Sequence, residues 1–146
     1  MDAAEIIDLL GLVAHPEGGW YRETWRPEGP DGGRPAGTAI YFLLVADEWS
    51  HWHKVDGDEI WHHYAGAPLE LWMSPDARHS ERFVLGTDLM AGQRPQLVVP
   101  SGVWQGAVSL GDWTLVGATV VPGFTFDRWE LAPPGWEPGR PLPSAG

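Results

Sequence analysis

The chain contains no cysteine. Disulfide bonds and thiolate metal ligands are therefore both excluded, and the absence suits a reducing compartment. No apolar run reaches the roughly 18 residues that a membrane-spanning helix needs. The first residues, Met1–Glu5, lack the basic stretch with which a secretory signal begins. We therefore expect a cytoplasmic protein without a membrane partner.

Basic residues are scarce as well. The chain has 9 lysines and arginines against 20 aspartates and glutamates, and its formal net charge is −11. No block of basic residues is present, so binding of nucleic acid through its phosphates is not expected. At 146 residues the chain is long enough for one domain with a single substantial core.

Helix-forming sequence is confined to the N-terminus, where one short helix is predicted over residues 2–10. Asp2 can cap this helix, Glu5 completes a capping-box pattern, and Gly11 ends it. The rest of the chain consists of short apolar or alternating segments separated by turns, which is typical of an all-β sandwich or barrel. The predicted strands cover residues 20–25, 38–45, 50–54, 58–64, 69–73, 82–85, 96–99, 103–109, 113–121 and 124–131.

We expect residues 1–131 to form this single domain. The last segment, 132–146, contains five prolines and three glycines. That composition is typical of an extended or disordered tail.

Histidine and tryptophan, by contrast, are concentrated in one place. Four of the six histidines lie within residues 50–66, together with two of the ten tryptophans. The alternation of this segment around a turn predicts a strand–turn–strand. A structural role gives little reason for such a cluster, so the sequence indicates a site for a metal ion or a polar ligand.

The alternation also predicts which of these side chains converge. Side chains two apart in a strand share a face, so His51 and His53 are expected on one face of the first strand. Glu59, Trp61 and His63 share a face of the second strand. If the two strands pair as a hairpin, His53 and Glu59 lie on the same wall of the domain.

Five segments in order resemble the cupin superfamily, in its cupin-5 branch. They are residues 15–24, 38–44, 53–66, 85–105 and 122–126. The resemblance implies a double-stranded β-helix, the cupin jelly-roll barrel, usually paired as a homodimer. It implies no particular reaction, because the branch has no general assigned activity and a fold alone supplies none.

The metal-binding pattern of cupins is only partly present. The general pattern is His-x-His, three or four residues, Glu, six residues and Gly, and Glu59 with Gly66 fits its second half. Val55 occupies the slot of the second histidine, and Gln105 stands where the second motif usually has a histidine. The candidate ligands are His51, His53, Glu59 and Gln105. We expect that no cofactor is needed, with a divalent metal ion as the alternative.

The function expected is an enzyme with isomerase- or epimerase-like acid–base chemistry on a sugar or a nucleotide-sugar-like ligand. His53 is the candidate general base, and Glu59 orients it or acts as the partner acid. Tyr41 or His63 would serve the opposite side of the reacting carbon. The candidate ligand-binding residues are Glu17, Phe42, Trp52, Trp61, His63, Trp104 and Gln105.

Other expectations stay open beside this one. A non-catalytic module that binds a metabolite such as a sugar would use the same pocket, and a metal-dependent oxygenase would need the metal ion. His62 is expected to have a structural role, and His15 and His79 are expected at the surface. The apolar strand 38–45 and the many tryptophans favour a two-fold homodimer, since they would need a partner surface.

Overall fold

The structure is a computed structural model that describes residues 1–142. Its one α-helix, α1 (Ala3–Leu10), begins where the Asp2 side chain accepts a hydrogen bond of 2.9 Å from the Glu5 backbone N–H. It ends at Gly11, whose φ of 65° is the left-handed conformation that glycine adopts without strain. No helix in residues 1–142 is long and apolar enough to cross a membrane.

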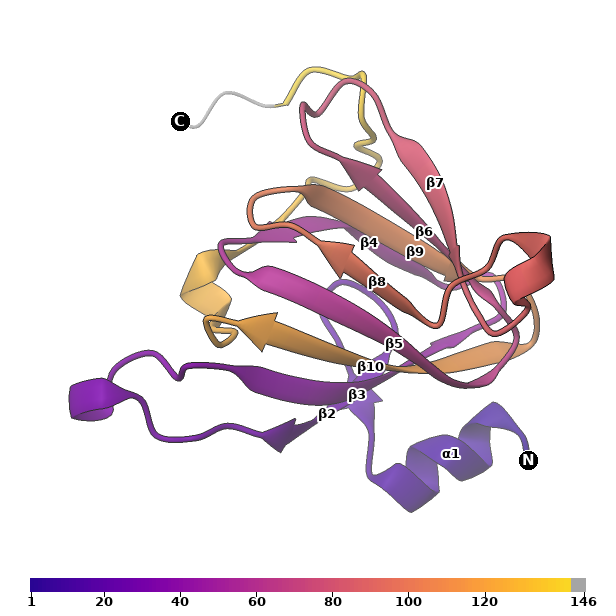
Figure 1. The fold of residues 1–146 in the computed structure, drawn as a ribbon, viewed down its shortest axis with the longest axis horizontal. Coiled ribbons are helices and arrows are strands. Elements are labelled where there is room, and N and C mark those ends of the chain that lie inside the picture. Colours follow the sequence, from indigo (N-terminus) through magenta and orange to yellow (C-terminus); the bar gives the residue numbers. More distant parts are fainter. Residues whose placement is uncertain (143–146) are drawn as a thin grey trace.

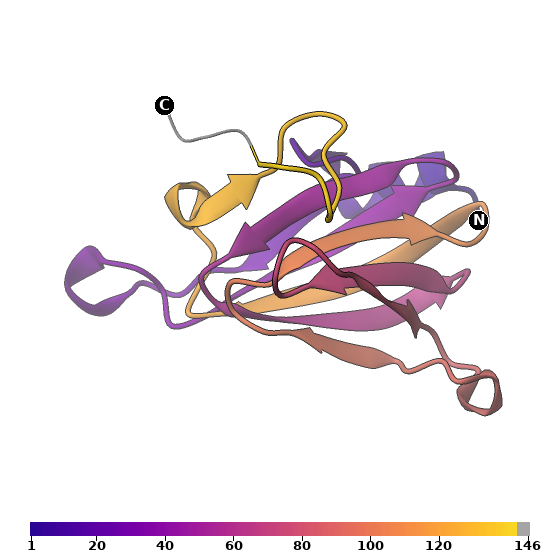
Figure 2. The same ribbon diagram turned by 90° about the horizontal axis from the view of Figure 1, so that it is seen from above.

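Two antiparallel sheets make up the rest of the fold (Figures 1 and 2). The first has the order β1-β2-β3-β10-β5-β8, and the second has the order β11-β4-β9-β6-β7. The bounds are β1 (Val13–Ala14), β2 (Trp20–Trp25), β3 (Thr38–Val45), β4 (Trp49–Val55), β5 (Asp58–Gly66), β6 (Leu69–Ser74), β7 (Glu81–Leu85), β8 (Gln96–Val99), β9 (Trp104–Ser109), β10 (Trp113–Val121) and β11 (Trp129–Leu131). Three short 3-10 turns join them: η1 (Pro30–Gly32), η2 (Leu89–Ala91) and η3 (Phe126–Arg128).

The two sheets face one another as a jelly-roll sandwich. The core between them is formed by inward-facing side chains from both sheets, which include Phe42, Leu44, Trp61, Leu69, Leu71, Leu85 and Val116. Alternation along each strand supplies these side chains, since every second residue points inward. The prediction of an all-β jelly roll with one short N-terminal helix is confirmed.

Strand β3 is covered on both of its faces. Phe42 and Leu44 point into the core, and Tyr41, Leu43 and Val45 point outward, where α1 packs on them through Ile6. Figure 1 shows α1 beside β2 and β3. The apolar run 38–45 is therefore buried by the chain itself, and a partner is not required to cover it.

Strand β4 departs from simple alternation. Its pairing with β9 shifts register between Ser50 and His53, which marks a β-bulge. Ser50 and His53 are both buried as a result, although they are three positions apart and would point to opposite faces of a regular strand. The His51 ring instead lies near the C-terminal segment, with Nε2 3.0 Å from the Pro133 carbonyl oxygen. The expected common face of His51 and His53 is wrong for this reason.

The segment after β11 packs on the domain. The Ala132 N–H donates a 2.9 Å hydrogen bond to the Trp52 carbonyl oxygen, and Ala132 and Trp136 are buried. The Trp136 ring lies against Trp104, with 4.8 Å between centroids. Residues 132–140 are thus held against the domain, which differs from the extended or disordered tail expected there. Residues 143–146 of the expected tail lie outside the described residues.

Candidate acid–base site between the sheets

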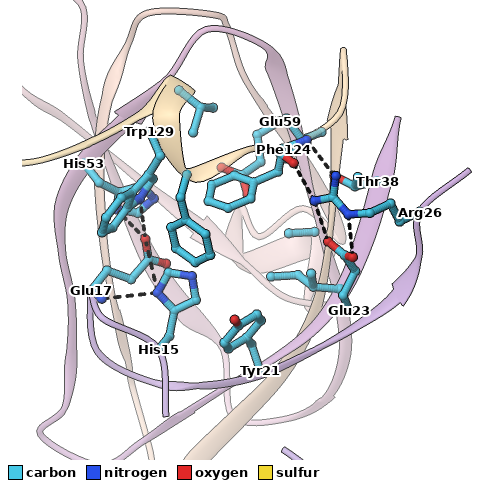
Figure 3. A pocket seen from close by; sticks show the side chains of 15 residues that line it. His15, Glu17, Tyr21, Glu23, Arg26, Thr38, His53, Glu59, Phe124 and Trp129 are labelled. Carbon is cyan, nitrogen blue, oxygen red and sulfur yellow. Dashed lines mark hydrogen bonds and ion pairs between the residues drawn. The ribbon is translucent and has the colours of Figure 1, made fainter. Parts of the chain in front are cut away.

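A pocket of about 210 Å³ opens between the two sheets near η3 (Figure 3). It receives side chains from six strands (β2, β3, β4, β5, β10 and β11), from the turn between β1 and β2, and from the segments that follow β2 and β10. Its lining consists of His15, Glu17, Tyr21, Glu23, Arg26, Thr38, Ile40, His53, Val55, Glu59, Ala118, Val120, Phe124, Phe126 and Trp129.

Glu17 reaches the pocket from the turn between β1 and β2. Gly18 and Gly19 follow it with φ of 103° and 84°, which favour glycine, and a Cβ at Gly18 would clash with the carbonyl oxygen of Trp49. The turn is therefore pressed against β4, where the His51 N–H donates a 2.7 Å hydrogen bond to the Glu17 carbonyl oxygen. This close approach buries the Glu17 carboxyl group.

The Glu17 carboxyl group has two polar partners. Its Oε2 accepts a hydrogen bond of 3.3 Å from the Trp129 indole Nε1–H and lies 3.2 Å from His53 Nδ1. Burial raises the pKa of Glu17 above its ordinary value, and the contact with the Trp129 indole opposes that rise. Glu17 therefore keeps its proton to a higher pH than an exposed glutamate does.

His53 is buried in a defined protonation state. Its Nδ1 lies 2.7 Å from the His51 carbonyl oxygen, which can only accept, so Nδ1 carries the proton. The lone pair of the neutral ring is then on Nε2. Burial lowers the pKa of His53, and the charge of Glu59 opposes that change. The imidazole is therefore a neutral base in the absence of a ligand.

Glu59 is held at the other end of a short hydrogen-bond chain. The Trp61 indole Nε1–H donates 2.8 Å to Gln105 Oε1, and Gln105 Nε2 donates 2.6 Å to Glu59 Oε1. An indole only donates, so it fixes the orientation of the Gln105 amide. Burial, and then the charge of Glu17, raise the pKa of Glu59 to about 7 against the opposing effects of His53 and Gln105. Glu59 can therefore both give and take a proton at physiological pH.

His15 lies in the pocket and not at the surface, which corrects the expectation for it. Its side chain is 5% exposed, and its ring packs edge-on against Tyr21 at 4.6 Å between centroids. The Glu17 N–H donates a 3.2 Å hydrogen bond to His15 Nδ1, so that nitrogen carries no proton. Burial lowers the pKa of His15, and the ring is neutral.

Aromatic rings form the remaining wall. Phe126 of η3 packs against Phe124 and Trp129, with 5.0 and 5.6 Å between centroids. Beside this wall, Arg26 makes a two-point ion pair with Glu23, at 2.7 and 3.0 Å, and donates 2.6 Å to the Phe124 carbonyl oxygen. The only arginine in the pocket lining is therefore already paired with a carboxylate.

The structure brings three of the residues singled out from the sequence to the pocket lining: Glu17, His53 and Glu59. Gln105 lies directly behind Glu59, and the buried Trp61 and Phe42 belong to the core below.

The other singled-out residues lie elsewhere. Tyr41 faces α1 on the outer side of the first sheet, because inward positions of β3 are the even-numbered ones. Trp52 and Trp104 pack with Trp136 on the outer face of the second sheet. His63 Nε2 lies 3.1 Å from the Ala67 carbonyl oxygen, away from the pocket. Tyr41 and His63 are therefore not placed to serve the opposite side of a ligand in this cavity.

Several lining residues were missed: His15, Tyr21, Phe124, Phe126 and Trp129. Tyr21 and Glu23 share a face of β2, so the alternation of that strand carried a usable signal. The aromatic residues after β10 show no alternation that could have identified them, because they belong to an irregular segment with a 3-10 turn.

The donor atoms do not fit a resident metal ion. Of the four candidate ligands, His51 lies outside the pocket, and Gln105 Oε1 accepts the Trp61 indole N–H. Within residues 1–142, no group of three or more histidine and carboxylate side chains is arranged to hold a metal. No metal-assisted step is derived for this site, and the oxygenase expectation has no support in the donor geometry.

Comparison with known proteins places this chain in a family. The model of the family described as "Cupin superfamily (DUF985)" matches residues 4–132. The uncharacterized protein YML079W of Saccharomyces cerevisiae is 30% identical over 144 residues, covering 84% of this chain and 71% of the yeast protein. The crystal structure of protein SO0799 from Shewanella oneidensis is 43% identical, with a TM-score of 0.84 over 90% of this chain and 84% of that one.

A hypothetical protein from Leishmania major is also similar in structure. It is 32% identical, with a TM-score of 0.79 over 89% of this chain and 86% of that one. The printed names of these relatives state no activity. The chain belongs to the Cupin_5 family of the cupin superfamily.

Proposed function

We propose that this protein is an isomerase- or epimerase-type enzyme that moves a proton on a small polar molecule such as a sugar. One observation carries the proposal: two buried carboxyl groups, Glu17 and Glu59, line one cavity together with a neutral imidazole, His53. The carboxyl groups come from separate elements and lie apart in the pocket (Figure 3).

Acid–base isomerisation needs a base and an acid on different sides of one carbon. In the proposed step, one ionised carboxylate takes the proton from a carbon next to a carbonyl group. The C–H electron pair forms the carbon–carbon double bond of an enediolate, the carbonyl π electrons move to the oxygen, and that oxygen holds the negative charge until the C=O bond forms again. The other carboxyl group, in its acid form, returns a proton to the opposite face of the carbon.

The perturbed pKa values suit this exchange. A general acid–base catalyst works best when its pKa lies near the working pH, and the pKa of Glu59 is raised to about 7. The pKa of Glu17 is raised as well. One carboxyl group in its acid form and one ionised carboxylate supply the acid and the base. His53, with its free lone pair on Nε2, is the further candidate for proton transfer at an oxygen.

The size of the cavity limits the ligand. Pockets for drug-sized ligands span about 300–1,000 Å³, and this one has about 210 Å³. A monosaccharide-sized molecule therefore matches it better than a larger one. The nucleotide of a nucleotide sugar would have to lie outside the pocket.

Deuterium exchange tests the proposal without knowledge of the product. We expect the protein in D₂O to place deuterium on the carbon next to the carbonyl group of at least one aldose or ketose in a panel, followed by NMR. Glu59→Gln and Glu17→Gln each remove one carboxyl group and should slow the exchange by about 100-fold or more. His53→Ala should slow it as well.

The control is Glu81→Gln, which removes an exposed carboxyl group on β7 and should exchange like the wild type. Saturable binding of a sugar with no exchange in any wild-type sample would contradict the enzyme and favour a metabolite-binding module. Equal exchange rates in the wild type and in both glutamate variants would contradict the assigned roles.

A further inference from the structure

We infer that the pocket recognises a small polar amine, a ligand that carries one cationic ammonium group and hydroxyl groups, as amino sugars do. Glu17, Glu59 and the aromatic wall of Phe124, Phe126 and Trp129 would hold the ammonium group. The inference deepens the proposed function and rests on it, since it concerns the ligand of the same pocket.

The lack of a lysine or arginine partner for two buried carboxyl groups is the first argument. Ionised side chains inside proteins are normally paired, because an unpaired buried charge is costly. Neither Glu17 nor Glu59 contacts a lysine or an arginine among the described residues. Their nearest basic neighbours are His15 and His53. His15 Nδ1 accepts the Glu17 N–H and carries no proton, and burial lowers the pKa of both rings, which favours their neutral forms. The missing positive charge is what an ammonium group would supply.

The pairing of Arg26 is the second argument for a cationic ligand, and it concerns the outer part of the pocket. Arg26 donates from Nε and Nη2 to the Glu23 carboxylate, and from Nη2 also to the Phe124 carbonyl oxygen, so its charge is already paired with a carboxylate. It is the only arginine or lysine in the pocket lining. A ligand carboxylate or phosphate would lack a free cation there and would be repelled by Glu17 and Glu59 across a medium of low dielectric constant. The lining therefore disfavours anionic ligands.

The aromatic wall adds a positive preference for a cation. Ammonium groups are attracted to the faces of aromatic rings, most strongly to tryptophan and when water is excluded. Tyr21, Phe124, Phe126 and Trp129 all line the cavity, and the Trp129 indole also contacts Glu17. Rings and carboxylates therefore meet at the same part of the pocket, an arrangement that suits an ammonium group better than a neutral hydroxyl group.

The charge balance agrees with the proposed chemistry. If Glu17 and Glu59 share one proton, the pair carries one negative charge. One ammonium group neutralises that charge and leaves one carboxyl group as the acid and the other as the base. The bound ligand then balances the negative charge of the pocket, and the other carboxyl group keeps the proton that it needs as the general acid.

NMR titration of the Trp129 indole N–H tests the inference, because this group lies in the pocket and its signal is assigned with Trp129→Phe. The probes are two matched sets: glucosamine, glucose and glucuronate, and ethanolamine with ethylene glycol. We expect each amine to bind about tenfold or more tightly than its neutral partner at pH 7.5, and glucuronate to bind most weakly. Glu17→Gln and Glu59→Gln should each lose most of this preference, whereas Glu81→Gln should keep it.

Equal or tighter binding of the neutral partners or of glucuronate would overturn the inference. So would the lack of any saturable shift with both amines at their highest soluble concentrations. The two proposals can fail separately. A preference for amines without deuterium exchange would contradict only the proposed enzymatic activity. Deuterium exchange on sugars without a preference for amines would contradict only the proposed class of ligand.

Discussion

Glu59 shows how one residue is kept ready for proton transfer at a cost in stability. Burial works against its ionised form, while the Gln105 amide, oriented by the Trp61 indole, stabilises that form. The balance raises the pKa of Glu59 to about 7 from an ordinary 4.5. Between these two pH values the folded chain keeps a proton that the unfolded chain has released, so the free energy of unfolding falls as the pH rises.

Glu59→Gln should therefore stabilise the protein, and more so at high pH. Each pKa unit corresponds to about 1.4 kcal/mol, so the loss from pH 4.5 to above 7 amounts to about 3 kcal/mol for this residue. The glutamine can still accept the hydrogen bond from Gln105 but cannot ionise. Urea unfolding at pH 5 and pH 8 measures the effect. A free-energy difference between variant and wild type that is the same at both pH values would contradict the raised pKa.

The sequence predicted the acidic residues of the pocket better than it predicted the other residues that line it. Glu17 and Glu59 were selected from a constrained turn and a motif position, and both line the cavity. Tyr41 was selected because it lies in a buried strand, but burial does not say which of two faces a side chain occupies. His15 was missed because its ring packs against Phe42, Phe126 and Trp129, which are distant in the sequence, and such contacts are not encoded locally.

At the scale of elements, the strands were predictable and their irregularities were not. The residue alternation of β5 correctly placed Glu59 and Trp61 on the inner face. In β4, one bulge moved His51 from the expected inner face to the Pro133 carbonyl oxygen. A bulge changes the face of a side chain without changing the hydrophobic pattern around it. The metal hypothesis depended on His51, so this single irregularity removes one of its ligands.

The C-terminal segment holds β11 in place, and β11 forms part of the pocket wall. Strand β11 pairs only with β4, and its first residue, Trp129, contacts Glu17. The segment that follows anchors β11 through Trp136, which is 5% exposed and packs on Trp104. Proline-rich composition predicted an extended chain, but it could not predict that one tryptophan would dock.

Trp136→Ala should therefore destabilise both the fold and the pocket wall. Removing a buried tryptophan costs about 3 kcal/mol or more, and a segment that detaches locally lowers that figure. We expect a loss of about 2–3 kcal/mol in urea unfolding and faster hydrogen exchange at β11. The control Glu137→Ala changes the exposed neighbour and should leave both unchanged. Unaltered exchange at β11 in Trp136→Ala would show that the segment does not hold the pocket wall.

At the scale of the whole molecule, the edges of the sheets bear on self-association. The first sheet ends at β1 and β8, where Val13 and Val98 are more than half exposed. Exposed edge strands with apolar residues are surfaces on which a second copy can pair. The net charge of −11 opposes that pairing, because two acidic chains repel each other at long range.

The two-fold homodimer expected from the sequence is thus a prediction with a definite salt dependence. Light scattering should give a mass of twice the 16.1 kDa of one chain at micromolar concentration. Added salt should tighten the dimer, because it screens the repulsion between the copies and leaves the apolar contact intact. Val98→Lys and Val13→Lys each place a charge on one edge, and the variant that dissociates identifies the interface. A single-chain mass at both low and high salt would contradict the dimer, and it would mean that each pocket functions without a residue from a second copy.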